Sequence, residues 1–234
     1  MAKKIPGKLN APPPQAEFDA LPLDKWCRNG GGFFVRIHSL NAGTGKPWPP
    51  LHFSRRNNTR FDPADGEGTL YIAGTLSGAL MEMLDDRWGP VGSAGRSITR
   101  KELKTMWVTV ISVPPVHLFD ATGPNLSKIG TDAQLLSGDH KVARAWALRL
   151  MRHPAGIGGI LYPSRHDPQR SNVALFERPG LLPGVLNKRI GPSIATKWKR
   201  TKEHETLIYG CAMPLQKHPD LKKSLLEMEA AILP

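Results

Sequence analysis

The chain has 234 residues and carries 32 lysines and arginines against 20 acidic residues, which gives a net charge of +12. Hydrophobic residues make up 40% of it, which is enough for a packed core and excludes a wholly disordered chain. No run of about 18 apolar residues occurs, which excludes a membrane-spanning helix, and two cysteines are too few for a disulfide scaffold. The charge predicts an anionic partner and leaves nucleic acid, an acidic protein and a phosphate-bearing small molecule open.

The first residues predict an extended, loosely held leader. Residues 1–25 are rich in lysine, proline and alanine, a composition typical of extended segments. The basic stretch from Met1 to Gly7 leads into the prolines at 12–14 and not into an apolar segment, so we expect no secretory signal. We therefore expect a cytoplasmic protein, which agrees with the low cysteine content.

The next part of the chain alternates strands with loops and one helix. Residues 33–38 are aromatic and β-branched and predict a strand, and residues 69–73 predict a second. Between them lies a long polar loop, residues 39–59, of a length that is usually functional or mobile. A helix is predicted over residues 77–88, with Glu82 on the flank of its apolar face, where a carboxylate can sit at the edge of a cleft.

The second half of the chain predicts more elements of both types. We expect a helix that is capped by Asp139 and runs to about Arg152, and a final helix that begins near Pro219. Further strands are predicted at residues 106–113, 158–162, 173–176 and 206–213. Short strands mixed with a few helices, without an internal repeat, indicate an α+β fold.

The final helix carries four apolar residues at helical spacing, Leu221, Leu225, Met228 and Ile232. We expect this face to pack on the core, as the apolar face of a surface helix normally does. A contact surface for a second chain is the alternative.

The sequence lacks the common motifs of metal and nucleotide sites. It has no Cys-x-x-Cys, no His-Glu-x-x-His and no pair of histidines at helix-face spacing, so we expect no metal site. The glycines at 156, 158 and 159 precede a predicted strand, whereas a dinucleotide-binding turn follows one. A Walker-type phosphate loop and the nucleophile elbow of the α/β-hydrolases are absent too.

Five polar residues lie in predicted strands, turns or apolar helix segments, where apolar residues would be expected: Arg36, Arg60, Tyr71, Glu82 and Ser164. Each has an ordinary interpretation when it is taken alone. An arginine in a strand usually lies at a solvated edge, a strand tyrosine is usually core, and a helical glutamate usually faces solvent. The order and setting of the five together is more specific.

With these residues the sequence resembles the RES family, which is named for its arginine, glutamate and serine. The resemblance runs from Phe33 to about Pro179. Its fragments are Phe34–Ile37, Thr59–Pro63, Gly68–Ala73, Ser77–Leu84, Gly159–Ser164 and Ser171–Phe176. The sequence departs from the family in two places: a glycine usual near the second arginine is missing, and Asp62 stands where asparagine is usual. Both departures concern the phosphate end of the site.

The resemblance implies a fold similar to that of the ADP-ribosyltransferase toxins, a mixed β core with flanking helices. Residues 31–182 are expected to form the RES domain, with an N-terminal extension over 1–30 and a C-terminal extension over 183–234 that packs on or beside it. Proteins of this family are typically the toxin of a toxin–antitoxin pair and deplete NAD⁺. The resemblance therefore implies an NAD⁺ glycohydrolase or phosphorylase that cleaves the nicotinamide–ribose bond, with NAD⁺ as substrate, water or inorganic phosphate as acceptor, and no cofactor.

The resemblance also implies roles for individual residues. Glu82 is expected to stabilise an oxocarbenium-like transition state, and Arg36 and Arg60 to hold the pyrophosphate, since arginine offers paired donors to phosphate oxygens. Tyr71 is expected to stack on the nicotinamide or a ribose. Ser164 is expected to hydrogen-bond the ribose or the attacking group, and Asn172 to contact the substrate as well. In this scheme Glu82, Arg36 and Ser164 are the catalytic residues.

The expected partner is a cognate antitoxin, which in this family often carries an Xre-type DNA-binding region. A homo-oligomer stays open, and neither a membrane nor direct contact with nucleic acid is expected. Two other functions are left as alternatives. One is transfer of ADP-ribose to a macromolecule, and the other is binding of nucleic acid without catalysis, which steep salt dependence and absent NAD⁺ turnover would indicate.

Overall fold

The structure is a computed structural model of the whole chain, and it describes residues 9–63, 65–84, 97–164, 167–177, 208–209 and 212–234. The helices are α1 (Gln15–Asp19), α2 (Leu76–Leu84), α3 (Arg100–Lys104), α4 (Asn125–Lys128), α5 (Gln134–Ser137), α6 (His140–Arg152) and α7 (Leu221–Glu227), with short 3-10 turns η1 (Leu23–Trp26) and η4 (Leu215–Lys217). The strands are β1 (Cys27–Asn29), β2 (Gly32–Ser39), β3 (Thr69–Ala73), β4 (Ser97–Thr99), β5 (Met106–Val113), β6 (His117–Asp120), β7 (Gly159–Pro163), β8 (Ser171–Phe176), β9 (Ile208–Tyr209), β10 (Met213–Pro214) and β11 (Ala231–Leu233).

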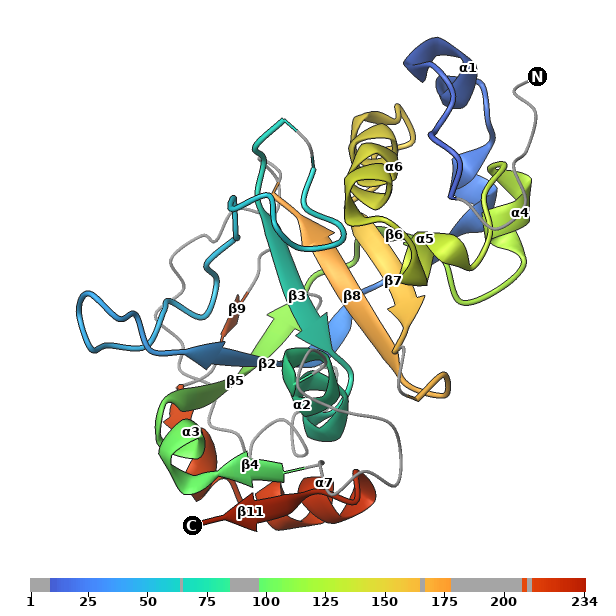
Figure 1. Cartoon of the computed structure of the whole chain (residues 1–234). Helices are drawn as coiled ribbons and strands as arrows, with labels where there is room; N and C mark the ends of the chain where they lie inside the picture. Colours follow the sequence, from blue (N-terminus) through green and yellow to red (C-terminus); the bar gives the residue numbers. More distant parts are fainter. Residues whose placement is uncertain (1–8, 64, 85–96, 165–166, 178–207, 210–211) are drawn as a thin grey trace.

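Most of the described strands join one mixed sheet with helices on its sides (Figure 1). The strand order is β1–β6–β7–β8–β3–β2–β5–β10, and β9 also pairs with β5. The β6–β7 ladder is parallel, whereas β2 pairs antiparallel with both β3 and β5. A separate parallel pair joins β4 to β11 near the C-terminus. The predicted α+β class with a mixed β core is thus confirmed.

The strongest sequence patterns produced the predicted elements. The predicted strands at 33–38, 69–73 and 106–113 are β2, β3 and β5, and those at 158–162 and 173–176 are β7 and β8, each to within two residues at either end. Helix α6 begins after Asp139, whose Oδ1 accepts a hydrogen bond of 2.7 Å from the Lys141 amide, as an N-cap does. Helix α2 is described to Leu84, and the rest of its predicted length lies outside the described residues.

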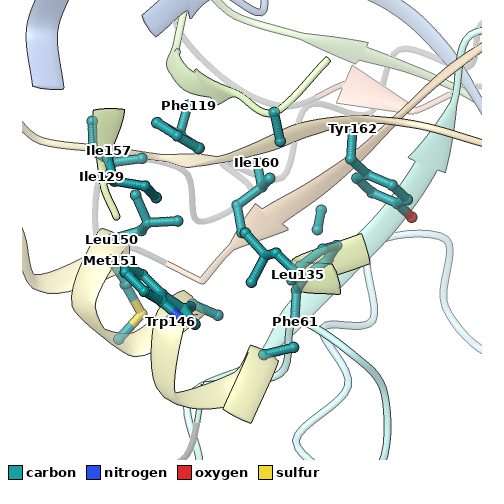
Figure 2. Close-up of a cluster of buried hydrophobic side chains, with 14 of the residues drawn as sticks. Phe61, Phe119, Ile129, Leu135, Trp146, Leu150, Met151, Ile157, Ile160 and Tyr162 are labelled. Carbon is teal, nitrogen blue, oxygen red and sulfur yellow. The ribbon is translucent and has the colours of Figure 1, made fainter. Parts of the chain in front are cut away.

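The largest apolar cluster lies between α6 and one face of the sheet (Figure 2). Trp146, Leu150 and Met151 of α6 are buried against Ile160 of β7 and Phe119 of β6. Figure 2 shows Tyr162 at the edge of this cluster, with its hydroxyl directed away from the apolar side chains. In the described part of the chain, no helix combines the length and hydropathy needed to cross a bilayer.

The prediction of a loosely held leader is wrong for residues 9–25. Leu9, Phe18 and Leu23 are buried in the largest cluster, and Phe18 meets Trp146 edge to face with ring centroids 5.9 Å apart. The Trp146 Nε1 donates to the Asn10 carbonyl at 2.8 Å. Proline-rich backbone still presents carbonyl acceptors, and a few well-spaced apolar residues are enough to attach such a segment to a core.

The C-terminal predictions need two corrections. Leu221, Leu225 and Met228 are buried, so the expectation that this face packs on the core is confirmed for these three residues. Ile232 does not belong to the helix, because α7 ends at Glu227 and Ile232 lies in β11 with 39% of its surface exposed. The predicted strand over 206–213 is two short strands, β9 and β10, with residues between and before them outside the described part.

Candidate active site

A cavity of about 450 Å³ lies over β2 and β3 beside helix α2. Its polar lining comes from segments far apart in the sequence and includes Arg36, Arg60, Tyr71, Glu82, Tyr162 and Asn172. Five of these six are residues that the sequence analysis assigned to one site. The structure therefore brings most of the predicted site residues together around a single volume of the size that small-molecule sites have.

Glu82 lies on α2 with its carboxylate held in place at the cavity. The neighbouring residues Leu80 and Leu84 are buried, so the helix is fixed on the core while the Glu82 side chain reaches the cavity. Its Oε1 accepts a 3.0 Å hydrogen bond from the Tyr162 hydroxyl, and its Oε2 accepts a 2.8 Å hydrogen bond from the Asn172 Nδ2. One donor on each oxygen fixes the plane of the carboxylate, which is the preorganisation that electrostatic catalysis requires.

Tyr162 lies at the site, as Asn58, Thr59 and His140 also do, although its sequence position predicts only part of a strand. Strand β7 presents it to the cavity, and its ring meets Phe61 edge to face with centroids 5.1 Å apart. Burial and the nearby Glu82 carboxylate raise the pKa of the Tyr162 hydroxyl well above its ordinary value. The hydroxyl therefore stays protonated and remains a donor to Glu82. One signal in the sequence could have indicated Tyr162. It lies two residues before Ser164, and residues two apart along a strand point to the same face of the sheet.

Arg36 projects from β2 and anchors the following loop while it lines the cavity. Its Nη1 donates to the Pro50 carbonyl and its Nη2 donates to the His52 carbonyl at 2.9 Å. Burial lowers the pKa of the guanidinium to about 10, so it is still charged at neutral pH. A guanidinium has five N–H groups, and two of them serve these carbonyls. Arg36 thus combines a structural role with a positive charge at the cavity wall.

The turn that carries Arg60 is built by Asp62 and Tyr71. Asp62 is fully buried, and its Oδ2 accepts from the amides of Asn58 at 3.2 Å and Thr59 at 3.1 Å, while its Oδ1 accepts from the Thr59 hydroxyl. The Tyr71 hydroxyl accepts from the Phe61 amide at 2.8 Å, and burial together with the Asp62 charge raises its pKa. Tyr71 is therefore tied to the backbone of this turn through its hydroxyl.

Arg60 itself is oriented by a carbonyl from another part of the chain. Its Nη1 donates to the Gly138 carbonyl at 2.8 Å, just before helix α6. The two arginines thus reach the same volume as Glu82 from separate elements. A cavity lined by two guanidinium groups and a carboxylate can bind an anionic ligand and still present negative charge to an electron-poor carbon.

The aspartate at position 62 fits the turn as well as the family's usual asparagine does. In an Asp62→Asn variant the amide oxygen can accept from the two backbone amides while its NH₂ donates to the Thr59 hydroxyl oxygen. We expect the free energy of unfolding to change by less than about 1 kcal/mol in that variant. Asp62→Ala leaves the buried amides without their acceptor and is expected to cost about 1–3 kcal/mol. Urea denaturation of both variants measures the difference; equal losses in the two would contradict this role.

Ser164 is the predicted site residue that the structure does not bring to the cavity. It follows β7 and is buried, and its amide donates to the Arg170 carbonyl at 2.7 Å. Its hydroxyl is buried without a hydrogen-bond partner among the described residues, and residues 165 and 166 next to it lie outside them. Its role in substrate contact stays a prediction.

The Asn172 Oδ1 is buried without a partner among the described residues, so this side-chain amide is held at Glu82 by its nitrogen alone.

Within the described ranges, no three histidine, cysteine, aspartate or glutamate side chains gather closely enough to hold a metal ion.

Comparison with known proteins gives a family and a fold. The family model described as the RES domain matches residues 34–194. The MbcT toxin in the "Crystal structure of the M.tuberculosis MbcT-MbcA toxin-antitoxin complex" is similar in structure, with a TM-score of 0.50 at 17% sequence identity. The similarity covers 71% of this chain and 85% of that one. A comparison with curated protein sequences gives no match.

Proposed function

Since the chain belongs to the RES domain family, we propose that it is the toxin of a toxin–antitoxin pair and acts by cleaving the nicotinamide–ribose bond of NAD⁺. The observation that carries the proposal is the Glu82 carboxylate, held by Tyr162 and Asn172 at a cavity that Arg36 and Arg60 also line. The similar fold of a toxin from a toxin–antitoxin complex supports the same proposal.

The proposed reaction requires a negatively charged group near the ribose, and Glu82 is the proposed carboxylate. In NAD⁺ the nicotinamide nitrogen carries a positive charge, and the bond to ribose C1′ breaks with its electron pair going to that nitrogen. Nicotinamide leaves as a neutral base, and positive charge develops on the ribose ring. A fixed carboxylate stabilises this oxocarbenium-like state, as the carboxylates of glycosidases do. Because Tyr162 and Asn172 already hold Glu82, little reorganisation is needed as the charge appears.

The second step forms a new bond to the ribose carbon that nicotinamide has left. An oxygen of water or of inorganic phosphate bonds to C1′, and the product is ADP-ribose or ADP-ribose 1″-phosphate, with the proton of a reacting water passing to the solvent. We expect the same Glu82 carboxylate to hold the ribose 2′-hydroxyl during both steps. The products distinguish a glycohydrolase from a phosphorylase.

Arg36 and Arg60 supply the positive charge that the dinucleotide pyrophosphate needs. Both are charged at neutral pH, and both line the cavity in the neighbourhood of Glu82. Arginine suits this task because its planar guanidinium presents paired donors to phosphate oxygens. Each is also anchored to backbone carbonyls, which lowers the entropy lost when substrate binds.

Expression of the protein in a bacterial host tests the proposed function. We expect induction to arrest growth and to lower cellular NAD⁺ content before growth stops. The Glu82→Gln variant, expressed to the same level, should do neither. Growth arrest with an unchanged NAD⁺ content would contradict NAD⁺ depletion as the cause.

The Tyr162→Phe variant tests the hydrogen bond to Glu82. Phenylalanine keeps the ring against Phe61 and removes only the hydroxyl donor. We expect kcat for NAD⁺ cleavage to fall about 10- to 100-fold with KM nearly unchanged, since a hydrogen bond to a charged group contributes about 1.5–3 kcal/mol. Steady-state kinetics measures this, with thermal unfolding as the control for stability. A kcat equal to that of the parent would mean that Tyr162 does not position the carboxylate.

A toxin needs a partner that restrains it in its own host. We propose a cognate antitoxin encoded beside this chain, with an acidic or terminal segment that enters the basic cavity. Affinity purification of the toxin co-expressed with the neighbouring gene product should recover both. Recovery of the chain alone, still toxic to cells in the presence of that product, would contradict this partner.

A further inference from the structure

Helix α7 packs against α2, the helix that carries Glu82. Leu221 and Leu225 of α7 are buried in the same apolar cluster as Leu76 and Leu80 of α2, and Figure 1 shows α7 beneath α2. The RES domain match ends at residue 194, so α7 lies outside it. A segment beyond the family match therefore contacts the helix on which the proposed chemistry depends.

Glu227 ends α7 and bonds to the first turn of α2. Its Oε2 accepts a 2.9 Å hydrogen bond from the Ser77 hydroxyl. The same oxygen accepts a 3.0 Å hydrogen bond from the Arg170 Nη2. Glu227 thus touches α2 directly and also touches the loop that connects β7 to β8, where Arg170 lies.

Arg170 joins the same turn of α2 from the other side. Its Nη1 donates to the hydroxyls of Thr75, at 3.0 Å, and Ser77. The Thr75 hydroxyl in turn accepts from the Gly78 amide at 3.0 Å, which makes it the N-cap of α2. Asp167 orients Arg170 by accepting from its Nε at 2.6 Å. Thr75, Ser77, Arg170 and Glu227, which we call the α2 clamp, therefore link three segments of the chain.

The α2 clamp holds the same two elements that meet at the catalytic carboxylate. Glu82 of α2 is bound by Tyr162 and Asn172, and these two residues lie on β7 and β8, the strands whose connecting loop carries Arg170. Ser77 precedes Glu82 by five residues, which is about 7.5 Å along a helix. Movement of the first turn of α2 relative to the β7–β8 pair would therefore displace Glu82 relative to its two donors.

From this geometry we infer that Glu227 is a positioning residue for Glu82. The C-terminal segment would then contribute to the reaction by fixing the position of α2. The inference rests on the proposed function, because it assigns Glu227 a role in that reaction. Glu227 does not line the cavity and acts only through α2 and Arg170. Displacements of about 1 Å in a catalytic group can lower rates by as much as 10²-fold, so even a partial loosening is measurable.

Both charged members of the clamp are ionised at neutral pH. The Ser77 hydrogen bond and then the Arg170 guanidinium lower the pKa of the Glu227 carboxyl below its ordinary value. The hydrogen bond to Asp167, followed by that to Glu227, raises the pKa of Arg170. The Glu227–Arg170 ion pair is therefore formed over the whole neutral range.

The test compares Glu227→Ala with Glu229→Ala in the full-length protein. Alanine at 227 removes the oxygen that accepts from Ser77 and Arg170, whereas glutamine would keep an acceptor there. Glu229 lies two residues further along and is exposed, so its substitution is a matched loss of one negative side chain. We expect Glu227→Ala to lower kcat for NAD⁺ about three- to tenfold with KM within about twofold of the parent, and Glu229→Ala to change neither. Amide hydrogen exchange in residues 76–84 should rise in Glu227→Ala alone.

The two measurements separate this inference from the proposed function. Unchanged exchange in α2 of Glu227→Ala would overturn the inference whether or not the protein consumes NAD⁺. Faster exchange in this variant with an unchanged kcat would also overturn it, because the clamp would then hold the helix without affecting Glu82. If the parent protein never consumes NAD⁺ and exchange is still faster in Glu227→Ala, the proposed function is refuted and the clamp on α2 is supported.

A double-variant comparison with Arg170 distinguishes positioning from general destabilisation. Arg170→Ala removes the link between α2 and the β7–β8 loop, so adding Glu227→Ala to it should lower kcat by a smaller factor than Glu227→Ala does in the parent protein. Independent effects that multiply in the double variant would contradict a shared clamp.

Discussion

Replacing Glu82 by glutamine is expected to lower the rate of NAD⁺ cleavage at least about 100-fold while the protein stays folded. Glutamine has the shape of glutamate but no negative charge, so the stabilisation of the developing ribose cation is lost. Its amide oxygen can still accept from the Tyr162 hydroxyl. The Asn172 amide, whose Oδ1 is buried without a partner in the described part of the chain, can turn over to accept from the new NH₂ group. The local structure therefore tolerates the change.

The measurement is release of nicotinamide by the purified variant under saturating NAD⁺. Circular dichroism and thermal unfolding confirm that the variant is folded. Glu17→Gln is the matched control, because Glu17 is an exposed residue of α1 that does not line the cavity. A folded Glu82→Gln protein that releases nicotinamide at the parent rate would remove Glu82 from the mechanism.

The second large effect is expected from Arg60→Ala, which should raise KM for NAD⁺ about 10- to 100-fold and change kcat much less. Hydrogen bonds to charged groups contribute about 1.5–3 kcal/mol, and the pyrophosphate stays charged throughout the reaction, so the loss falls equally on ground and transition states. Gly138, whose carbonyl Arg60 contacts, is only half-buried, so this carbonyl can bond to water in the variant. Fold stability should therefore change little.

Arg55→Ala provides the comparison for Arg60. Arg55 lies five residues earlier in the same loop and pairs with Glu177 at 2.6 Å, but it does not line the cavity. Its substitution removes one positive charge from the same segment and should leave KM within about twofold of the parent, since an exposed ion pair contributes little. Parent-like KM and kcat in Arg60→Ala would mean that this arginine does not bind the substrate.

The central sheet was predictable because its strands have local and unambiguous patterns. Residues 106–113 are almost continuously apolar, and residues 69–73 follow a clear turn, so β5 and β3 begin and end where predicted. Asp139 ahead of an amphipathic run likewise located α6. These features act over a few residues, and burial in the sheet reinforces them.

The termini were harder to predict because their structure depends on distant contacts. Phe18 and Leu23 are isolated apolar residues in a proline-rich segment, and their burial depends on α6 being present to receive them. At the other end, Glu229 adopts a positive φ of 53°, so the chain leaves the helix and Ile232 enters a strand paired with β4. No local pattern in the sequence specifies either contact.

For the site, the sequence indicated which residues take part but not how they are arranged. The order of Arg36, Arg60, Tyr71 and Glu82 in the sequence led to the residues that the cavity gathers. The sequence could not show that Tyr162 and Asn172 would each hold one oxygen of Glu82, because that depends on how α2 sits across β7 and β8. Nor could it show that Glu227, outside the family match, would bond to the same helix.

The net charge of +12 is what remains after every acidic residue is matched by a basic one. Arg28, Arg152 and Arg170 pair with Asp120, Asp65 and Asp167, so these arginines are neutralised locally and do not contribute to the excess. Arg36 and Arg60 place their charge at the cavity instead. In the proposed function, these two arginines bind the pyrophosphate of a dinucleotide.

Mass spectrometry of the products that the purified protein forms from NAD⁺ is the most direct test of the proposed chemistry. The protein is incubated with NAD⁺ in phosphate-free buffer and in buffer with inorganic phosphate. We expect free nicotinamide in at least one buffer, together with ADP-ribose if water is the acceptor or ADP-ribose 1″-phosphate if phosphate is. Intact NAD⁺ in both buffers, from a protein shown to be folded, would contradict cleavage of the nicotinamide–ribose bond.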